Sequence, residues 1–300
     1  MNYYKRTADA LLKDLLDAFG AVLIEGPKWC GKTTTASQLA NSILRMQDPS
    51  MRDEYLVTAK TKPSILLNGD TPRLIDEWQD APMLWDAVRT TVDDRQIPGQ
   101  FILTGSNAVD KSQIHHSGAG RITRLRMLPM SLWESKESTG EVSLKELFNN
   151  PDYDIDGKMS KMSIEDLIFA ASRGGWPASL LARTPKAQLL VAKNYVQTIC
   201  LDDISGIDGK RRDAKLTSMI LRAYARNVST LVKKKSLIDD VISSGEVSCH
   251  TDTFDDYVSA LEKLFVIQNV SAWCPAIRSK TAIRSSVKRC FCDQSIPIAL

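Results

Sequence analysis

The sequence lacks the features that mark several classes of protein. No run of apolar residues approaches the roughly 18 that a membrane-spanning helix requires. The N-terminal segment is charged throughout, which argues against a secretory signal. With 15 glycines and 12 prolines among 300 residues, the composition is that of an ordinary globular chain rather than a disordered or collagen-like one. We therefore expect a cytoplasmic protein that does not bind a membrane.

Cysteine is present, but its spacing does not indicate a metal site. The six cysteines are irregularly spaced and none forms a CxxC pair. Cys249-His250 and Cys290-x-Cys292 fit no common zinc spacing, so we expect reduced thiols and no bound metal there. The net charge is only +3, which does not by itself indicate a nucleic-acid binder.

A glycine-rich loop between an apolar run and a helical stretch is the strongest motif. The run is Ala21–Ile24, and the helix is predicted over Thr34–Ala40. The loop matches GxxxxGK[ST] at every fixed position. The residues expected to hold a nucleotide are Gly26, Pro27, Lys28, Trp29, Cys30, Gly31, Lys32, Thr33 and Thr34.

The chemistry of phosphate binding explains these residue types. Glycines allow the tight bend that points successive main-chain amides at phosphate oxygens, and the following helix N-terminus adds partial positive charge. Lys32 is predicted to reach the β- and γ-phosphates, and the Thr33 hydroxyl to coordinate Mg²⁺. The alternative, a chance glycine turn before a helix, fits the flanking pattern poorly.

An acidic pair ends the next candidate strand, Leu74–Glu77. Asp76 is predicted to hold Mg²⁺, and Glu77 to act as the general base that activates water. The apolar lead is short because Pro72 and Arg73 precede it, so a surface acidic pair is the alternative. A further strand is predicted at Ile65–Leu67, after a polar stretch that contains a helix.

Two later features complete the candidate site. The strand Phe101–Leu103 ends in small polar residues, of which Thr104, Ser106 or Asn107 is predicted to contact the γ-phosphate or the attacking water. Arg121 follows two glycines and precedes a strand at Ile122–Leu128, and it is a candidate to act on a neighbouring subunit's nucleotide. A solvated loop arginine is the equal alternative.

The chain resembles the prokaryotic AAA-type P-loop ATPases that carry a C-terminal domain of unknown function, related to the archaeal ATPase group. The matching segments are Tyr4–Arg6, Gly26–Thr34, Leu74–Gln79, Ala81-Pro82, Trp85-Asp86, Leu103–Ser106, Gly118–Arg121, Pro129–Leu132, Gly174–Pro177 and Asp202–Ile204. The resemblance implies ATP and Mg²⁺ as ligands, a homo-oligomer, and an arginine finger at Arg121. Members commonly continue into a nuclease-like fold, which we expect to be absent because the chain stops at Leu300.

The expected fold class is α/β, with a parallel sheet flanked by helices and a helical, winged-helix-like C-terminal region. The predicted units are an ATPase domain over residues 1–162, a helical region over 163–230 and a winged-helix-like region over 231–300. Within the last, helices are predicted at Ser236–Ser244 and from a Thr253 cap, with strands at Val266–Val270 and Val287–Cys292. Glu134–Lys161 is predicted to be a surface excursion.

Two functions stay open for this sequence. The first is hydrolysis of ATP to ADP and phosphate, and the second is a nucleotide-gated switch with little turnover that binds DNA or a partner protein. Nine basic residues and one acid between residues 210 and 235 suit DNA phosphates or a solvated surface. Further cations lie at Arg278, Lys280, Arg284, Lys288 and Arg289. A metabolic kinase is a weaker third interpretation.

Overall fold

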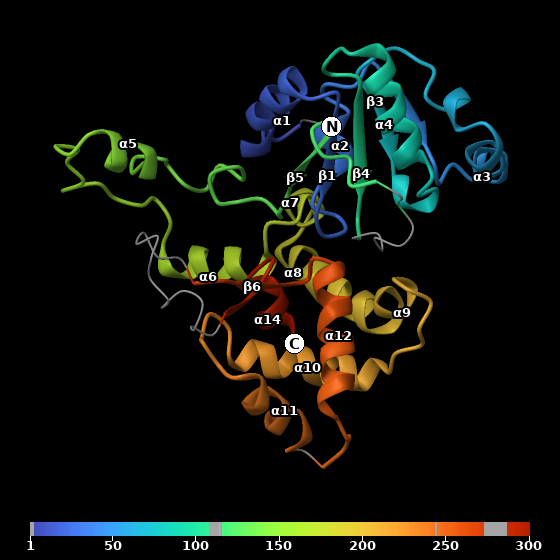
Figure 1. Cartoon of the computed structure of the whole chain (residues 1–300). Helices are drawn as coiled ribbons and strands as arrows, with labels where there is room; N and C mark the ends of the chain where they lie inside the picture. Colours follow the sequence, from blue (N-terminus) through green and yellow to red (C-terminus); the bar gives the residue numbers. More distant parts are fainter. Residues whose placement is uncertain (1–2, 108–113, 115, 244, 273–286) are drawn as a thin grey trace, which may run out of the picture.

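A five-stranded parallel sheet forms the first half of the chain in this computed structural model, which describes residues 3–107, 114, 116–243, 245–272 and 287–300. The strand order is β2-β3-β4-β1-β5. The strands are β1 (Ala21–Glu25), β2 (Ser42–Arg45), β3 (Arg73–Asp76), β4 (Phe101–Gly105) and β5 (Ile122–Arg126). The predicted α/β class with a parallel sheet is confirmed (Figure 1).

Alternating side chains of the central strand explain why helices cover both faces of the sheet. Val22 and Ile24 pack with buried residues of α1 (Thr7–Ala18) and α2 (Lys32–Ala36). Ala21 and Leu23 pack with α3 (Arg52–Thr61) and α4 (Leu84–Arg95) on the other face. Because strand side chains point alternately to opposite faces, one apolar run supplies two cores.

Two local predictions for this half are wrong. Ile65–Leu67 is not a strand: Pro63 begins a short 3₁₀ helix, η1 (Pro63–Ile65), and a turn follows. The strand beside β3 is β2 instead, whose four residues are only partly apolar. The helix after the loop is also shorter than predicted, because it begins at Lys32 and ends at Ala36.

An extended arm separates the two halves of the chain. The arm carries α5 (Leu144–Asn149), none of whose residues is buried, and Figure 1 shows it reaching away from the sheet and from the C-terminal helices. This agrees with a surface excursion over most of Glu134–Lys161. Glu134 itself is the exception, because it is buried with 6% of its surface exposed.

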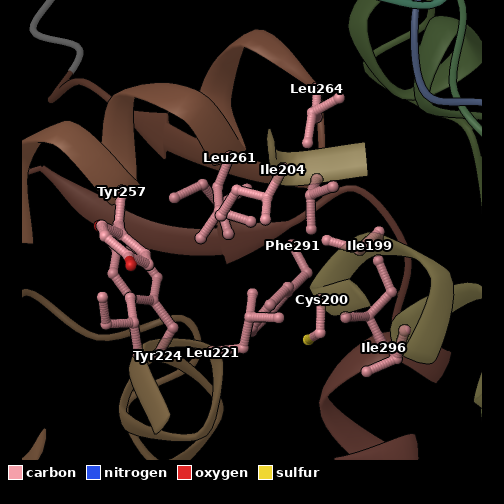
Figure 2. Packing of buried hydrophobic residues seen from close by; sticks show 14 of the residues in the cluster. Ile199, Cys200, Ile204, Leu221, Tyr224, Tyr257, Leu261, Leu264, Phe291 and Ile296 are labelled. Carbon is pink, nitrogen blue, oxygen red and sulfur yellow. The ribbon is translucent and has the colours of Figure 1, made fainter. Parts of the chain in front are cut away.

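The C-terminal half is mostly helical and has its own core. Its elements are α6 (Ile164–Arg173), α7 (Pro177–Leu181), α8 (Pro185–Thr198), the π-helical η4 (Ile199–Asp203), α9 (Ile204–Gly206), α10 (Ala214–Arg226), α11 (Lys234–Ile242), α12 (Thr251–Lys263), β6 (Ile267–Val270), β7 (Lys288–Phe291) and α14 (Ser295–Ala299). Figure 2 shows Ile199, Leu221, Tyr257 and Phe291 among the residues of this one buried cluster, to which α8, η4, α9, α10, α11, α12, β6, β7 and α14 contribute.

The order of elements near the C-terminus follows the prediction, with one correction. The helices α11 and α12 precede β6 and β7, which pair antiparallel. Thr253 does not cap the second helix, because α12 begins at Thr251 and His250 is the residue before it. Asp256 is free of a capping role and instead accepts hydrogen bonds from Lys210 and Arg212. Among the described residues, no helix has the length and apolar character to cross a bilayer.

Candidate nucleotide-binding site

The glycine-rich loop leaves β1 and turns directly into α2. Gly31 lies immediately before the helix in a left-handed conformation, with φ +98°. Gly26 packs so closely on the next segment that an added Cβ would lie 2.0 Å from the Met127 carbonyl oxygen. The loop therefore requires glycine at both positions, at Gly31 for its backbone conformation and at Gly26 for its close packing.

The loop lysine is buried against the loop's own carbonyl groups. Lys32 has 4% of its surface exposed, and its ammonium donates to the carbonyl oxygens of Gly26 at 3.0 Å and Pro27 at 2.8 Å. A buried charge needs such partners, and phosphate oxygens are stronger acceptors for it than neutral carbonyl groups. The geometry therefore suits an anion that takes over these hydrogen bonds.

The end of β3 brings oxygen donors beside the loop. Oδ1 of Asp76 accepts hydrogen bonds from the hydroxyl groups of Thr33 and Thr104, each at 2.6 Å. A carboxylate and a hydroxyl are hard oxygen ligands of the kind that Mg²⁺ prefers. No group of three or more His, Cys, Asp or Glu able to hold a metal occurs within the described part of the chain. The residues fit a Mg²⁺ whose other ligands are nucleotide phosphates and water.

Glu77 is held in a fixed position next to that pair. Its backbone is left-handed, with φ +55°, an uncommon conformation for a residue with a side chain. Its amide donates to Thr104 Oγ1 at 3.3 Å, while its carboxylate accepts from Ser106 Oγ at 3.2 Å and from the Gln79 amide. The sequence analysis predicted no role for Gln79, although this residue ends Leu74–Gln79, one of the segments that carry the resemblance.

The strand β4 supplies two different kinds of polar residue. Thr104 is fully buried and contacts Asp76 and the Glu77 amide, so it lies behind the carboxylates. Ser106 instead lines the cavity described below. Between Thr104 and Ser106, the geometry favours Ser106 for direct contact with a phosphate in the cavity. Thr104 instead holds Asp76 and the Glu77 backbone in place.

A cavity of about 870 Å³ opens beside the loop and is shared by the two halves of the chain. The first half contributes Lys28, Trp29, Gly31, Lys32, Thr33, Thr34, Gln47, Glu77 and Ser106. The second half contributes a mostly apolar wall from α7 and α8, which comprises Pro177, Ala178, Leu181, Ala187, Leu190, Val191 and Asn194. Sequence reasoning missed this wall, because no motif in α7 or α8 indicates a ligand.

A smaller cavity of about 100 Å³ adjoins the first at Gly31 and is lined by residues that include Tyr3, Tyr4, Thr34 and Pro177. The Tyr3 hydroxyl donates to Asp9 at 2.6 Å, and burial together with this hydrogen bond raises the pKa of Tyr3. The N-terminal tyrosines Tyr3 and Tyr4 thus lie near the loop.

A buried ion pair between Arg6 and Glu134, which the sequence analysis did not predict, contacts the glycine-rich loop. Nε of Arg6 lies 3.0 Å from Oε1 of Glu134. The Arg6 guanidinium also donates a hydrogen bond to the carbonyl oxygen of Cys30 at 2.7 Å. Burial opposes the charge on Glu134, but amide hydrogen bonds from Ser131 and Thr7 and the charge of Arg6 outweigh it. The pKa of Glu134 is therefore lower than that of an ordinary glutamate.

Arg121 lies away from its own chain's loop. It precedes β5, and its carbonyl accepts from the amide of Ala21, so it marks the edge of the sheet opposite the glycine loop. Its side chain is 47% exposed and pairs with Asp93 at 2.7 Å. Within one chain, the structure therefore does not bring Arg121 together with the other predicted site residues.

Comparisons with known proteins agree with this arrangement. Residues 18–136 match the family described as AAA domain, and residues 164–300 match a domain of unknown function (DUF8612). The uncharacterized proteins Rv2008c of Mycobacterium tuberculosis and Mb2031c of Mycobacterium bovis are each 24% identical over 279 residues, covering 90% of this chain and 54% of the relative. The chain thus spans about half the length of the curated relatives it matches.

One solved structure shares the fold over nearly the whole chain. The Walker-type ATPase PABY2304 of Pyrococcus abyssi is similar with a TM-score of 0.56 and 11% identity, over 99% of this chain and 95% of that one. The family models thus cover two successive parts of the chain: residues 18–136, which contain the parallel sheet and the glycine loop, match an AAA domain, and residues 164–300 match a domain of unknown function.

Proposed function

We propose that this chain binds Mg-ATP at the glycine loop and hydrolyses it to ADP and phosphate. The observation that carries the proposal is that Glu77 lines the same cavity as Lys32 and Thr33, with its carboxylate held by Ser106 and Gln79. A carboxylate fixed beside the terminal phosphate is suited to accept a proton from the attacking water.

The other residues of the cavity have complementary roles in this proposal. The loop amides and Lys32 hold the β- and γ-phosphates, while Thr33 and Asp76 hold Mg²⁺. When bound, Mg²⁺ neutralises charge on the phosphates. Glu77 orients the water and takes its proton, and Thr104 keeps Asp76 and the Glu77 backbone in place.

The substitution Glu77→Gln tests this assignment. We expect nucleotide affinity close to that of the unchanged protein and hydrolysis lower by about 100-fold or more, because the general base is lost while the cradle remains. Glu54→Gln, an exposed glutamate on α3, is the matched control. Hydrolysis by the Glu77→Gln variant at the normal rate would remove Glu77 from the mechanism.

A second candidate is a nucleotide-gated switch with little turnover. The cavity wall from α7 and α8 favours it, because a nucleotide there contacts both halves of the chain and biases their arrangement. A protein that binds Mg-ATP but releases no phosphate, even with DNA present, meets the expectation of the switch and contradicts the hydrolase.

The basic side chains of the C-terminal half give little support to DNA as the partner, because many of them are paired with carboxylates. Five of the nine basic residues between 210 and 235 pair with carboxylates: Lys210 with Asp256, Arg212 with Asp208 and Asp256, Lys215 with Glu246, Arg226 with Asp240, and Lys234 with Asp255. Arg278, Lys280 and Arg284 lie outside the described residues. DNA affinity that falls steeply as salt rises supports phosphate contacts, and absence of binding at low salt excludes them.

A further inference from the structure

An ion pair joins the glycine loop to the C-terminal half of the chain. The Lys28 ammonium lies 2.6 Å from Oδ1 of Asp203, across 175 positions of sequence. The two side chains differ in exposure: that of Asp203 is 10% exposed and that of Lys28 is 42% exposed. The carboxylate is thus fixed within the helical half, while the lysine lies where solvent or a ligand reaches it.

Neighbouring contacts place this pair at the junction of the two halves. Trp29, the next residue of the loop, has a left-handed backbone with φ +64°, and its ring lies 5.6 Å from that of Tyr195 on α8. Asp203 ends η4, the π-helical turn that continues α8. The helix α8 also provides part of the apolar wall of the cavity, so Lys28 is paired with the turn that continues a helix facing the nucleotide site.

Lys28 also lines the cavity in which a terminal phosphate would lie. In such loops the lysine at the position of Lys32 reaches the β- and γ-phosphates. Here its ammonium donates hydrogen bonds to the carbonyl oxygens of Gly26 and Pro27, the two residues directly before Lys28. Lys28, Lys32 and Glu77 line one cavity. A lysine has a flexible four-carbon stem and a single charged end, so it can exchange one anionic partner for another.

Resting on the proposed binding of ATP, we propose that Lys28 exchanges between Asp203 and the γ-phosphate, with Asp203 as its positioning residue. Without a γ-phosphate, Lys28 ties the loop to η4. With a nucleoside triphosphate in the cradle, the ammonium moves to the phosphate and the C-terminal half is released from the loop. Because coupling between two equilibria is reciprocal, Asp203 then weakens binding of the triphosphate selectively.

The test compares the affinities of Mg-ADP and of Mg with a non-hydrolysable ATP analogue across four proteins: unchanged, Asp203→Asn, Lys28→Met and the double variant. We expect Asp203→Asn to bind the analogue about fivefold more tightly or better, with ADP affinity altered less than twofold. We expect Lys28→Met to lose affinity for the analogue and keep that for ADP. In the double variant, Asp203→Asn then has no further effect, because the lysine through which it acts is gone.

Two control variants separate this exchange from a general structural effect. Asp202→Asn changes the adjacent, exposed carboxylate and is expected to leave both affinities unchanged. Lys28→Arg keeps the charge and is expected to restore discrimination between the analogue and ADP. Thermal unfolding of every variant establishes that it is folded before its affinities are compared.

Hydrogen exchange of the η4 amides provides a readout beside affinity. In the unchanged protein, we expect exchange over residues 199–203 to be faster with the ATP analogue than with ADP. In Asp203→Asn, it is expected to be equally fast with either nucleotide.

Weaker analogue binding by Asp203→Asn, equal shifts for both nucleotides, or additive effects in the double variant would overturn the exchange. Absence of any nucleotide binding by the unchanged protein would instead overturn the proposed function.

Discussion

At the scale of single residues, the candidate site depends on buried and partly buried charges that are each satisfied by specific partners. Lys32 donates hydrogen bonds to two loop carbonyl groups, and Asp76 accepts hydrogen bonds from two hydroxyl groups. Arg6 forms an ion pair with Glu134. Burying a charge without such partners costs several kcal/mol, so loss of one partner harms the other. The Arg6–Glu134 pair shows this most clearly, because both side chains are about 5% exposed or less.

Glu134→Gln is expected to lower the free energy of unfolding by about 3–5 kcal/mol at pH 7, because Arg6 is left without its counter-charge. The lowered pKa of Glu134 means that its charged form stabilises the folded state above the ordinary carboxyl pKa of about 4.3. That stability is lost as pH falls through the folded-state pKa. Urea unfolding at several pH values measures both effects, and the variant is expected to show a shallower decline below about pH 5.

Glu141→Gln on the exposed arm is the control, and we expect it to unfold like the unchanged protein. An equally steep loss of stability in acid for Glu134→Gln and the unchanged protein would show that Glu134 is not the group responsible.

At the scale of elements, local patterns predicted those parts of the fold that are set by local chemistry. The apolar run of β1, the glycine loop and the helix after it are adjacent in sequence and were predicted in the right order, and the strand pairings confirm the expected parallel sheet. The strand β2 was missed because its residues are mixed in polarity, while Ile65–Leu67 attracted the prediction by being apolar. Periodicity alone does not separate a short apolar turn from a strand.

Gly175, in the connection between α6 and α7, occupies a position that tolerates no side chain. An added Cβ would lie 2.0 Å from the Met130 carbonyl oxygen, and the Gly175 carbonyl accepts from the Met130 amide at 2.7 Å. We therefore expect Gly175→Ala to lower the free energy of unfolding by about 1–3 kcal/mol. Chemical denaturation measures the change.

Gly206→Ala is the matched control, because an added Cβ there meets nothing within 4 Å. If Gly175→Ala proved as stable as Gly206→Ala, the close packing between residues 130 and 175 would be incorrect.

At the scale of the whole molecule, the site joins two cores that the sequence does not connect by any motif. The residues of the loop and of β3 were predictable because phosphate chemistry requires particular residues at particular spacings. The wall from α7 and α8, and the Arg6–Glu134 pair, arise from tertiary packing between distant segments. Such packing leaves no local pattern from which it can be inferred. The unit boundaries near residues 162 and 230 stay predictions.

Arg121 is argued at this scale because its role requires a second copy of the chain. We propose that it acts on a neighbouring subunit's nucleotide, and we expect Arg121→Ala to lower hydrolysis by about 1,000-fold while nucleotide affinity is kept. Arg89→Ala, which removes the other cation paired with Asp93, is the control and is expected to hydrolyse ATP normally.

Mixing Arg121→Ala subunits with Lys32→Ala subunits tests the arrangement in trans. We expect recovery of part of the activity, because each variant supplies what the other lacks. A mixture as inactive as either variant alone would contradict action across a subunit interface, as would a monomer by light scattering in the presence of nucleotide.

The binding of Mg-ATP to the glycine loop is the central claim, and titration calorimetry of the purified chain with Mg and a non-hydrolysable ATP analogue tests it most directly. We predict saturable binding at one site per chain that is lost in Lys32→Ala, because that substitution removes the buried ammonium that would hold the terminal phosphates. Absence of binding heat in the unchanged protein over a range of temperatures, or equal affinity in Lys32→Ala, would contradict the account.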